Sequence, residues 1–138
     1  MGITRNIEEA REFFKGDRFA TENGMVIDEL DGEHAVTSVV ITDRHKNALG
    51  GVMGGAIFTL ADFAFAALTN DKEKATVAQQ VSINYLSAPK GTKLIATARY
   101  KKDGRSSCVV NIEVTDDTGR EIAQFVGTGF KLQSQEKK

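Results

Sequence analysis

Several residue types that mark whole classes of protein are scarce or missing in this chain. Among 138 residues there is no tryptophan, one proline, one cysteine and two histidines. The single cysteine, Cys108, excludes an internal disulfide and suits a reducing compartment. Its register with Val110 and Ile112 favours core packing over a nucleophilic role. So few cysteines and histidines leave no spacing typical of a zinc site, and we expect no metal.

An excess of either charge is also absent. Lysine and arginine number 18, aspartate and glutamate number 19, and the net charge is −1. This balance gives no electrostatic reason to expect nucleic acid or an anionic membrane as a partner. No basic segment precedes an apolar stretch in the manner of a secretion signal, so we expect a cytoplasmic protein. The length fits a single domain over residues 1–138, with a frayed tail at about 133–138.

Most of the sequence has the alternating pattern of strands connected by tight turns. Asp31-Gly32 and Asp103-Gly104 are strong hairpin signals between such runs. We predict about five to six strands, mostly antiparallel, over residues 25–30, 34–41, 76–86, 92–102, 108–114 and 121–132. In the strand 76–86 the apolar residues are expected on one face: Val77, Val81, Ile83 and Tyr85.

Two helices are predicted, a short one and a long one. The first covers about 6–15 and begins at a capping box formed by Asn6 and Glu9. The second covers 54 to about 69 (GGAIFTLADFAFAALT) and is apolar all round, whereas an amphipathic surface helix keeps one polar face. It is too short, and Asp62 is too central, for a transmembrane span. We therefore predict an α+β hotdog fold, an antiparallel sheet wrapped around one long buried central helix.

The long helix contains one carboxylate, Asp62, and begins with a pair of glycines. A buried and unpaired carboxylate is costly, so it has either nearby donors that satisfy it or a functional role. We favour the functional role, because Gly54 and Gly55 would let a substrate carbonyl approach the free N–H groups of a helix N-terminus. Those groups can stabilise an oxyanion, and a carboxylate can attack a thioester or activate water. For Gly50 and Gly51, a tight turn is an equally good explanation.

Helix geometry separates the two halves of this candidate site. Asp62 follows Gly55 by seven residues, which is about 10 Å along a helix that rises 1.5 Å per residue. A carbonyl within about 3 Å of the Gly55 N–H cannot also reach Asp62 of the same helix. The two groups can act together in a homodimer with antiparallel central helices, where they come from different chains.

The residues around the helix carry a family resemblance. The pattern N-x-x-G-x-x-(H)-G-G-x-x-x-x-L-A-D-x-A-x-A resembles the hotdog acyl-CoA thioesterases of the phenylacetic-acid-degradation (PaaI-like) type. The matching positions are Asn47, Gly50, Gly54, Gly55, Leu60, Ala61, Asp62, Ala64 and Ala66. The resemblance continues through INYLSAP, residues 83–89, and covers roughly residues 20 to 132. Where the family usually has histidine before the glycine pair, this chain has Met53.

The resemblance implies a set of roles and a shared-site assembly. An acyl- or aryl-acyl-CoA would be hydrolysed to free acid and CoA, with Asp62 as base or nucleophile and Gly55 as the main oxyanion donor. Gly54 would support Gly55, and Asn47 would orient the attacking group. No cofactor is implied. The active sites would be shared within a homodimer, often with two dimers packed as a tetramer.

Other candidates are weaker. Asn47 either orients the attacking group or only closes a loop Asx-turn. Gln80 either lines the acyl pocket or is a plain polar strand residue. Arg105, beside a hairpin turn, either meets the phosphates of CoA or is solvated. Met53 belongs to the substrate-binding set by position, and His45, in the charged segment DRHK, is expected to be solvated.

Two further functions are alternatives to hydrolysis. The first is a non-catalytic acyl-CoA-binding hotdog module that acts as a ligand sensor or regulator. Asp62 argues for the enzyme, whereas Met53, which cannot offer the hydrogen bond of a histidine, argues for the binding module. The second is a hotdog hydratase, whose usual pairing of aspartate with histidine is not apparent in this sequence.

Overall fold

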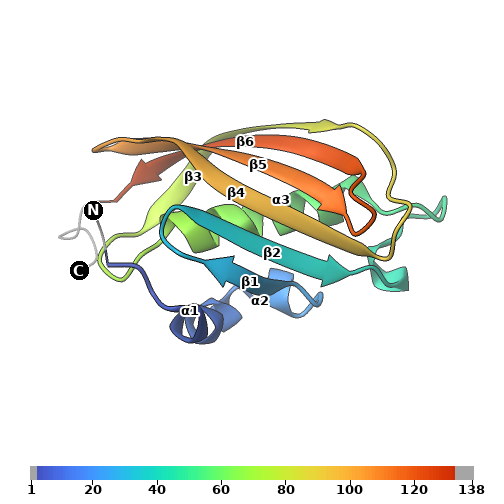
Figure 1. The fold of residues 1–138 in the computed structure, drawn as a ribbon, viewed down its shortest axis with the longest axis horizontal. Coiled ribbons are helices and arrows are strands. Elements are labelled where there is room, and N and C mark those ends of the chain that lie inside the picture. The colour runs from blue at the N-terminus through green and yellow to red at the C-terminus, as the bar shows by residue number, and fades with distance from the viewer. Residues whose placement is uncertain (1–2, 133–138) are drawn as a thin grey trace.

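One antiparallel sheet and one long helix form most of the structure, a computed structural model that describes residues 3–132 (Figure 1). The strands are β1 (Val26–Leu30), β2 (His34–Val40), β3 (Thr76–Tyr85), β4 (Lys93–Asp103), β5 (Ser107–Asp116) and β6 (Glu121–Lys131). They form one sheet in the order β1-β2-β4-β5-β6-β3, and every neighbouring pair is antiparallel. Helix α3 (Gly54–Thr69) lies against the concave side of the sheet. The predicted hotdog fold is confirmed.

Three short helical segments precede the sheet and lie beside β1 (Figure 1). They are α1 (Ile7–Phe13), the 3-10 turn η1 (Phe14–Gly16) and α2 (Arg18–Thr21). The capping box of α1 is present, because the Asn6 side chain accepts from the Glu9 N–H at 2.8 Å and Glu9 accepts from the Asn6 N–H at 3.0 Å. The predicted frayed tail at 133–138 lies outside the described residues.

Helix α3 has the predicted bounds, but the sheet does not enclose it on every side. Its contacts include all six strands, and its buried residues form the centre of the core: Ile57, Leu60, Ala61, Phe63, Ala64, Phe65, Ala67 and Leu68. The side of α3 that the strands do not cover is a stripe of four residues. Their spacing of four, three and four positions places them on one helix face: Gly55, Thr59, Asp62 and Ala66. None of them is buried. The expectation of a helix buried all round is therefore wrong for this stripe, and Asp62 is only partly buried.

Strand β3 lies at one edge of the sheet and, among residues 3–132, pairs only with β6. A bulge between Ala78 and Gln80 inserts one extra residue into β3. Side chains alternate between the two faces of a sheet along a strand. The extra residue therefore places the side chains before the bulge on the opposite face from the one that strict alternation predicts. Val81 packs against the core as predicted, whereas Val77 is 47% exposed on the other face. The prediction of one apolar face for the whole strand is therefore wrong at Val77.

A buried carboxylate, Asp116, fixes the turn between β5 and β6. The side chain is 1% exposed, and its two oxygens accept five hydrogen bonds. Oδ1 accepts from the Thr118 hydroxyl at 2.6 Å, the Thr118 N–H at 2.9 Å and the Arg120 N–H at 3.1 Å. Oδ2 accepts from the N–H groups of Lys90 and Gly91 at 2.8 and 2.9 Å. The Thr118 hydroxyl and these backbone donors hold the pKa of Asp116 well below its ordinary value, so the charged form stabilises the fold.

This arrangement predicts a specific loss of stability in acid. Because the folded-state pKa of Asp116 is depressed, its contribution is present above the ordinary aspartate pKa of about 3.9 and disappears as pH falls below it. Asp116→Asn places an amide N–H₂ against backbone donors, so we expect a lower free energy of unfolding at pH 7 and a weaker dependence on pH below about 4. Urea unfolding of both proteins between pH 3 and 7 measures this. Asp28→Asn, at an exposed position of β1, is the control, and equal stability of all three proteins at pH 7 would contradict the prediction.

Candidate functional site

The N-terminus of α3 presents free backbone donors. Met53 is its N-cap residue and makes no side-chain capping bond. The first intrahelical bonds run from the N–H groups of Ala56 and Ile57 to the Met53 carbonyl, at 3.0 and 3.4 Å. Within residues 3–132 the N–H groups of Gly54 and Gly55 have no acceptor, and Gly55 is exposed. These donors stand at the positive end of the helix dipole, where an oxyanion is stabilised.

The two glycines differ in what surrounds them. A Cβ on Gly54 would lie 3.1 Å from the Cζ and Oη atoms of Tyr85, and the Tyr85 hydroxyl donates to the Gly54 carbonyl at 3.1 Å. Close packing therefore accounts for glycine at position 54. A Cβ on Gly55 would meet only Met53 Cε, at an ordinary contact distance of 3.4 Å. Packing within the chain does not account for glycine at position 55, whose backbone faces open space.

His45 is buried, which corrects the expectation of a solvated residue. It belongs to the 3-10 turn η2 (Asp43–His45) and is 4% exposed. Its Nδ1 accepts from the Thr42 N–H at 3.0 Å, so Nε2 carries the hydrogen that is donated to the Asn23 carbonyl at 2.7 Å. Its own carbonyl accepts from the Met53 N–H at 2.9 Å. The imidazole thus connects the segment before α3 to Asn23. No local pattern predicts this contact, because the two residues are 22 positions apart.

Asn47 closes a loop between η2 and α3. Its Oδ1 accepts from the N–H groups of Leu49 and Gly51 at 3.0 and 3.2 Å, and its backbone N–H donates to the Gly51 carbonyl at 2.8 Å. Gly50 in this loop has a φ of 91°, in the region that favours glycine. The Asx-turn alternative for Asn47 is therefore present in the structure. Its amide nitrogen Nδ2 makes no hydrogen bond within the described residues and is the only donor left for a substrate or water.

Asp62 lies two helical turns beyond Gly55 and has no partner of opposite charge. Its carboxylate makes no hydrogen bond and no ion pair within the part of the chain that the structure describes. Burial raises the pKa of Asp62, and the nearby Asp17 carboxylate raises it further. A free carboxylate with increased proton affinity can act as a general base or a nucleophile.

Two adjoining cavities run along the open stripe of α3. The first, of about 500 Å³, is mostly apolar and contains Gly55 and Met53 in its lining, together with Phe58 and Thr59. The second, of about 320 Å³, is lined by Asp62 and shares Phe58 and Thr59 with the first. Phe19, which is 75% exposed on α2, borders both. The structure thus brings Gly55, Met53 and Asp62 to one groove, and we call these two cavities the α3 groove.

Gln80 and Arg105 lie away from the α3 groove of the same chain. Gln80 is exposed on the edge strand β3, where its Nε2 contacts the Ser82 hydroxyl at 3.3 Å. Arg105 lies in the β4–β5 turn and lines a polar cavity with Thr69, at the opposite end of α3 from Gly55. Neither residue meets the predicted site within one chain.

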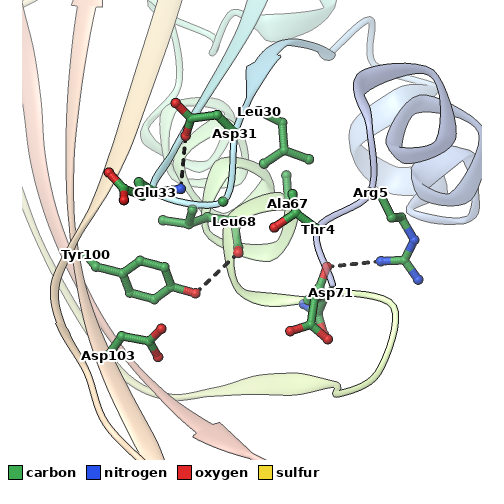
Figure 2. Close-up of a pocket in the computed structure, with 12 residues that line it drawn as sticks. Thr4, Arg5, Leu30, Asp31, Glu33, Ala67, Leu68, Asp71, Tyr100 and Asp103 are labelled. Carbon is green, nitrogen blue, oxygen red and sulfur yellow. Dashed lines mark hydrogen bonds between the residues drawn. The ribbon is translucent and has the colours of Figure 1, made fainter. Parts of the chain in front are cut away.

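A further cavity lies at the C-terminal end of α3, shown in Figure 2. The Tyr100 hydroxyl donates to the Leu68 carbonyl there at 3.3 Å. Burial, and then the charge of Asp103, raise the pKa of Tyr100. The acidic residues of the lining are Asp31, Glu33, Asp71 and Asp103. Arg5 also lines this cavity, but it donates to the Asn70 carbonyl at 3.0 Å. Because the four carboxylates outnumber this one cation and like charges repel, the cavity is a poor candidate for the phosphates of coenzyme A.

Neither a metal centre nor a membrane-spanning helix is present in the described part of the chain. Among residues 3–132, no group of three or more histidine, cysteine, aspartate or glutamate side chains is arranged to hold a metal ion. In the same range, no helix combines the length and apolarity that crossing a membrane requires.

Comparison with known proteins identifies the family. A family model described as the thioesterase superfamily matches residues 49–123, and the chain belongs to this superfamily. The acyl-coenzyme A thioesterase PaaI of Escherichia coli is 29% identical over 126 residues, which are 91% of this chain and 90% of that protein. The structure of E. coli PaaI, from the phenylacetic acid degradation operon, matches with a TM-score of 0.85 at 28% identity and covers 92% of this chain and 93% of that one.

A second solved structure comes from Streptococcus pneumoniae. It is a hypothetical thioesterase solved with coenzyme A, 26% identical, with a TM-score of 0.79. The match covers 88% of this chain and 98% of that one. Together these findings confirm the predicted resemblance to the PaaI-like hotdog thioesterases.

The buried histidine leads to a stability prediction. His45→Ala leaves the Asn23 carbonyl and the Thr42 N–H without their partner, so we expect the free energy of unfolding to fall by about 1–3 kcal/mol. Chemical denaturation followed by circular dichroism measures the change. Lys46→Ala, at the neighbouring exposed position, is the matched control. If both variants unfold at the same denaturant concentration as the parent, the hydrogen bonds of His45 do not stabilise the fold.

Proposed function

We propose that the protein hydrolyses the thioester bond of an acyl- or aryl-acyl-CoA and releases the free acid and CoA. The observation that carries the proposal is the α3 groove, where the unpaired Asp62 carboxylate and the free Gly55 N–H lie on the one side of the helix that the sheet does not cover. Family membership supports the reaction class. The acyl-coenzyme A thioesterase PaaI and the S. pneumoniae structure with coenzyme A support the substrate class.

The chemistry follows from the two groups. Asp62 takes a proton from water, and the oxygen of that water adds to the thioester carbon; direct attack by the carboxylate is the alternative route. The carbonyl oxygen becomes an oxyanion, which accepts a hydrogen bond from the Gly55 N–H and is stabilised by the helix dipole. Collapse of the tetrahedral intermediate breaks the carbon–sulfur bond, and the CoA thiolate leaves with the proton that Asp62 accepted from water. In the direct-attack route the acyl group is first held on Asp62 as an anhydride, the thiolate takes its proton from solvent, and a water then hydrolyses the anhydride to release the acid. The free Nδ2 group of Asn47 would orient the attacking water or carboxylate.

The proposed active site is shared between two copies of the chain. Asp62 follows Gly55 by seven positions, about 10 Å along the helix at 1.5 Å per residue, so one carbonyl cannot reach both groups of one chain. Strand β3 supports a dimer, because its free edge presents unpaired backbone groups over ten residues. A second copy paired along this edge would bring Gln80 toward the shared site. With the helices antiparallel, Arg105 of one copy would lie near Gly55 of the other, where it could meet a CoA phosphate.

A non-catalytic acyl-CoA-binding module is the second candidate function. The observation that favours it is Met53, which lines the groove beside Gly55 and offers no side-chain hydrogen bond to a substrate. The backbone donor of Gly55 does not depend on that side chain, and for this reason we prefer the enzyme. A panel of acyl-CoA esters assayed for thiol release, with calorimetric binding of the same esters, separates the two functions.

The role of Asp62 is tested by Asp62→Asn, which retains size and polarity but removes the base. We expect kcat to fall at least about a hundredfold, while the thermal unfolding temperature is unchanged or higher because a partly buried charge is removed. Thiol release from the best ester of the panel measures the rate. Glu33→Gln, at an exposed position, serves as the control. A folded Asp62→Asn protein with parental turnover would exclude Asp62 from the chemistry.

The shared site is tested by mixing two inactive chains. Asp62→Ala removes the base, and Gly55→Val blocks approach of the carbonyl while its Cβ makes only an ordinary contact with Met53. In a heterodimer, one site then carries both lesions and the other carries none. Random pairing makes half of the dimers mixed, so co-expression should restore about a quarter of parental activity. If each chain formed its own site, every site would carry one lesion, and verified heterodimers would stay inactive.

A further inference from the structure

Asp17 is an N-cap aspartate that does not cap its helix. It precedes α2, and aspartate at this position commonly accepts a hydrogen bond from the first helical N–H groups. Here the side chain makes no capping bond, and only its backbone carbonyl takes part, accepting from the Thr21 N–H at 3.0 Å. The carboxylate makes no hydrogen bond or ion pair with any described residue. The local structure of α2 therefore does not explain this side chain.

The Asp17 carboxylate lies on the same cavity as Asp62. This is the 320 Å³ part of the α3 groove, whose other lining residues are Arg18, Phe19, Ala20, Phe58, Thr59 and Phe63. Asp17 and Asp62 are the only carboxylates of this lining, and most of the remaining wall is aromatic or aliphatic. An apolar wall lowers the local dielectric and strengthens the repulsion between two negative charges.

The one positive charge in the lining of this cavity already has a partner. Arg18 is the only cationic residue of the lining, and its Nε donates to Glu22 Oε2 at 2.6 Å. Both of these side chains are mostly exposed, so their pair is solvated and neutralises little of the charge in the cavity. Helix α3 itself contributes no other charged side chain, because Asp62 is its only charged residue.

We propose that Asp17 is a positioning residue for the hydrolysis, whose carboxylate makes Asp62 a stronger base without contacting the substrate. This inference rests on the proposed function of Asp62. It is supported by the direction of two shifts: burial raises the pKa of Asp17, and burial together with the Asp17 charge raises the pKa of Asp62. A base whose pKa lies closer to the working pH accepts a proton more readily in the transition state.

The experiment is a comparison of Asp17→Asn with the parent protein. Asparagine retains the size of the side chain and is a good N-cap residue, so the variant should fold. Because the neighbouring negative charge is lost, the pKa of Asp62 should fall, and the acidic limb of the pH profile of kcat/KM should move to lower pH. The plateau of kcat should drop by about threefold, because the base is weaker. Asp17→Glu restores the charge and should return the acidic limb toward its parental position.

Two controls keep this inference separate from the proposed function. Carbon-13 NMR titration of the Asp62 carboxyl measures its proton affinity without any substrate, and Glu12→Gln, at an exposed position of α1, should leave it unchanged. If Asp17→Asn leaves both the NMR titration and the pH profile unaltered while Asp62→Asn is inactive, the inference is wrong and the proposed function stands. If Asp62→Asn retains full activity, the proposed role of Asp62 is wrong, and the positioning role of Asp17 fails with it.

Discussion

Six strands cover α3 without surrounding it, and this incomplete cover determines the rest of the molecule. The strand order places β1 and β3 at the two edges of the sheet, and the side of α3 that the sheet leaves free presents Gly55, Thr59, Asp62 and Ala66. A fully wrapped helix would force Asp62 to be neutral or paired, and would leave no space in front of the Gly55 N–H. The same geometry that buries Leu60 and Phe65 therefore also produces the groove.

The polar group at one end of the α3 groove belongs to the backbone, and the polar group at the other end belongs to a side chain. At Gly55 the free group is the backbone N–H, and it is available because the chain enters α3 through Met53 without a side-chain cap. At Asp62 the free group is a carboxylate, whose pKa is raised by burial and then by the charge of Asp17 from the preceding segment. Met53 therefore contributes only a side chain beside the free Gly55 N–H, whereas that donor itself belongs to the main chain.

Local sequence patterns predicted the fold well, and contacts between distant residues account for what they missed. The bounds of α3 followed from its glycine start and its continuous apolar run, and the hairpins followed from their Asp-Gly turns. The burial of His45 depends on the Asn23 carbonyl, and the role of Asp116 depends on Lys90 and Gly91. Neither contact has a signature within a short window of sequence. The bulge that turns Val77 outward is likewise set by the pairing of β3 with β6.

For the site, spacing along one helix indicated that Gly55 and Asp62 are too far apart to act on one carbonyl within a chain. It did not show that α2 brings Phe19 and Asp17 to the same groove, because α2 is only four residues long and has no apolar periodicity of its own. Asn47 was predicted with two alternatives, and the structure contains the Asx-turn while leaving its Nδ2 group free.

The two tyrosines of the chain stand at opposite ends of the central helix, and each donates its hydroxyl hydrogen to a helix carbonyl. Tyr85 bonds the Gly54 carbonyl beside the groove, and Tyr100 bonds the Leu68 carbonyl in the last turn. Because the sequence has no tryptophan, tyrosine dominates its near-ultraviolet absorption and its intrinsic fluorescence. The protein thus contains one spectroscopic reporter for each end of α3. Fluorine labelling of tyrosine would resolve the two ends as separate resonances, so ligand entry at one end could be followed against the other as an internal reference.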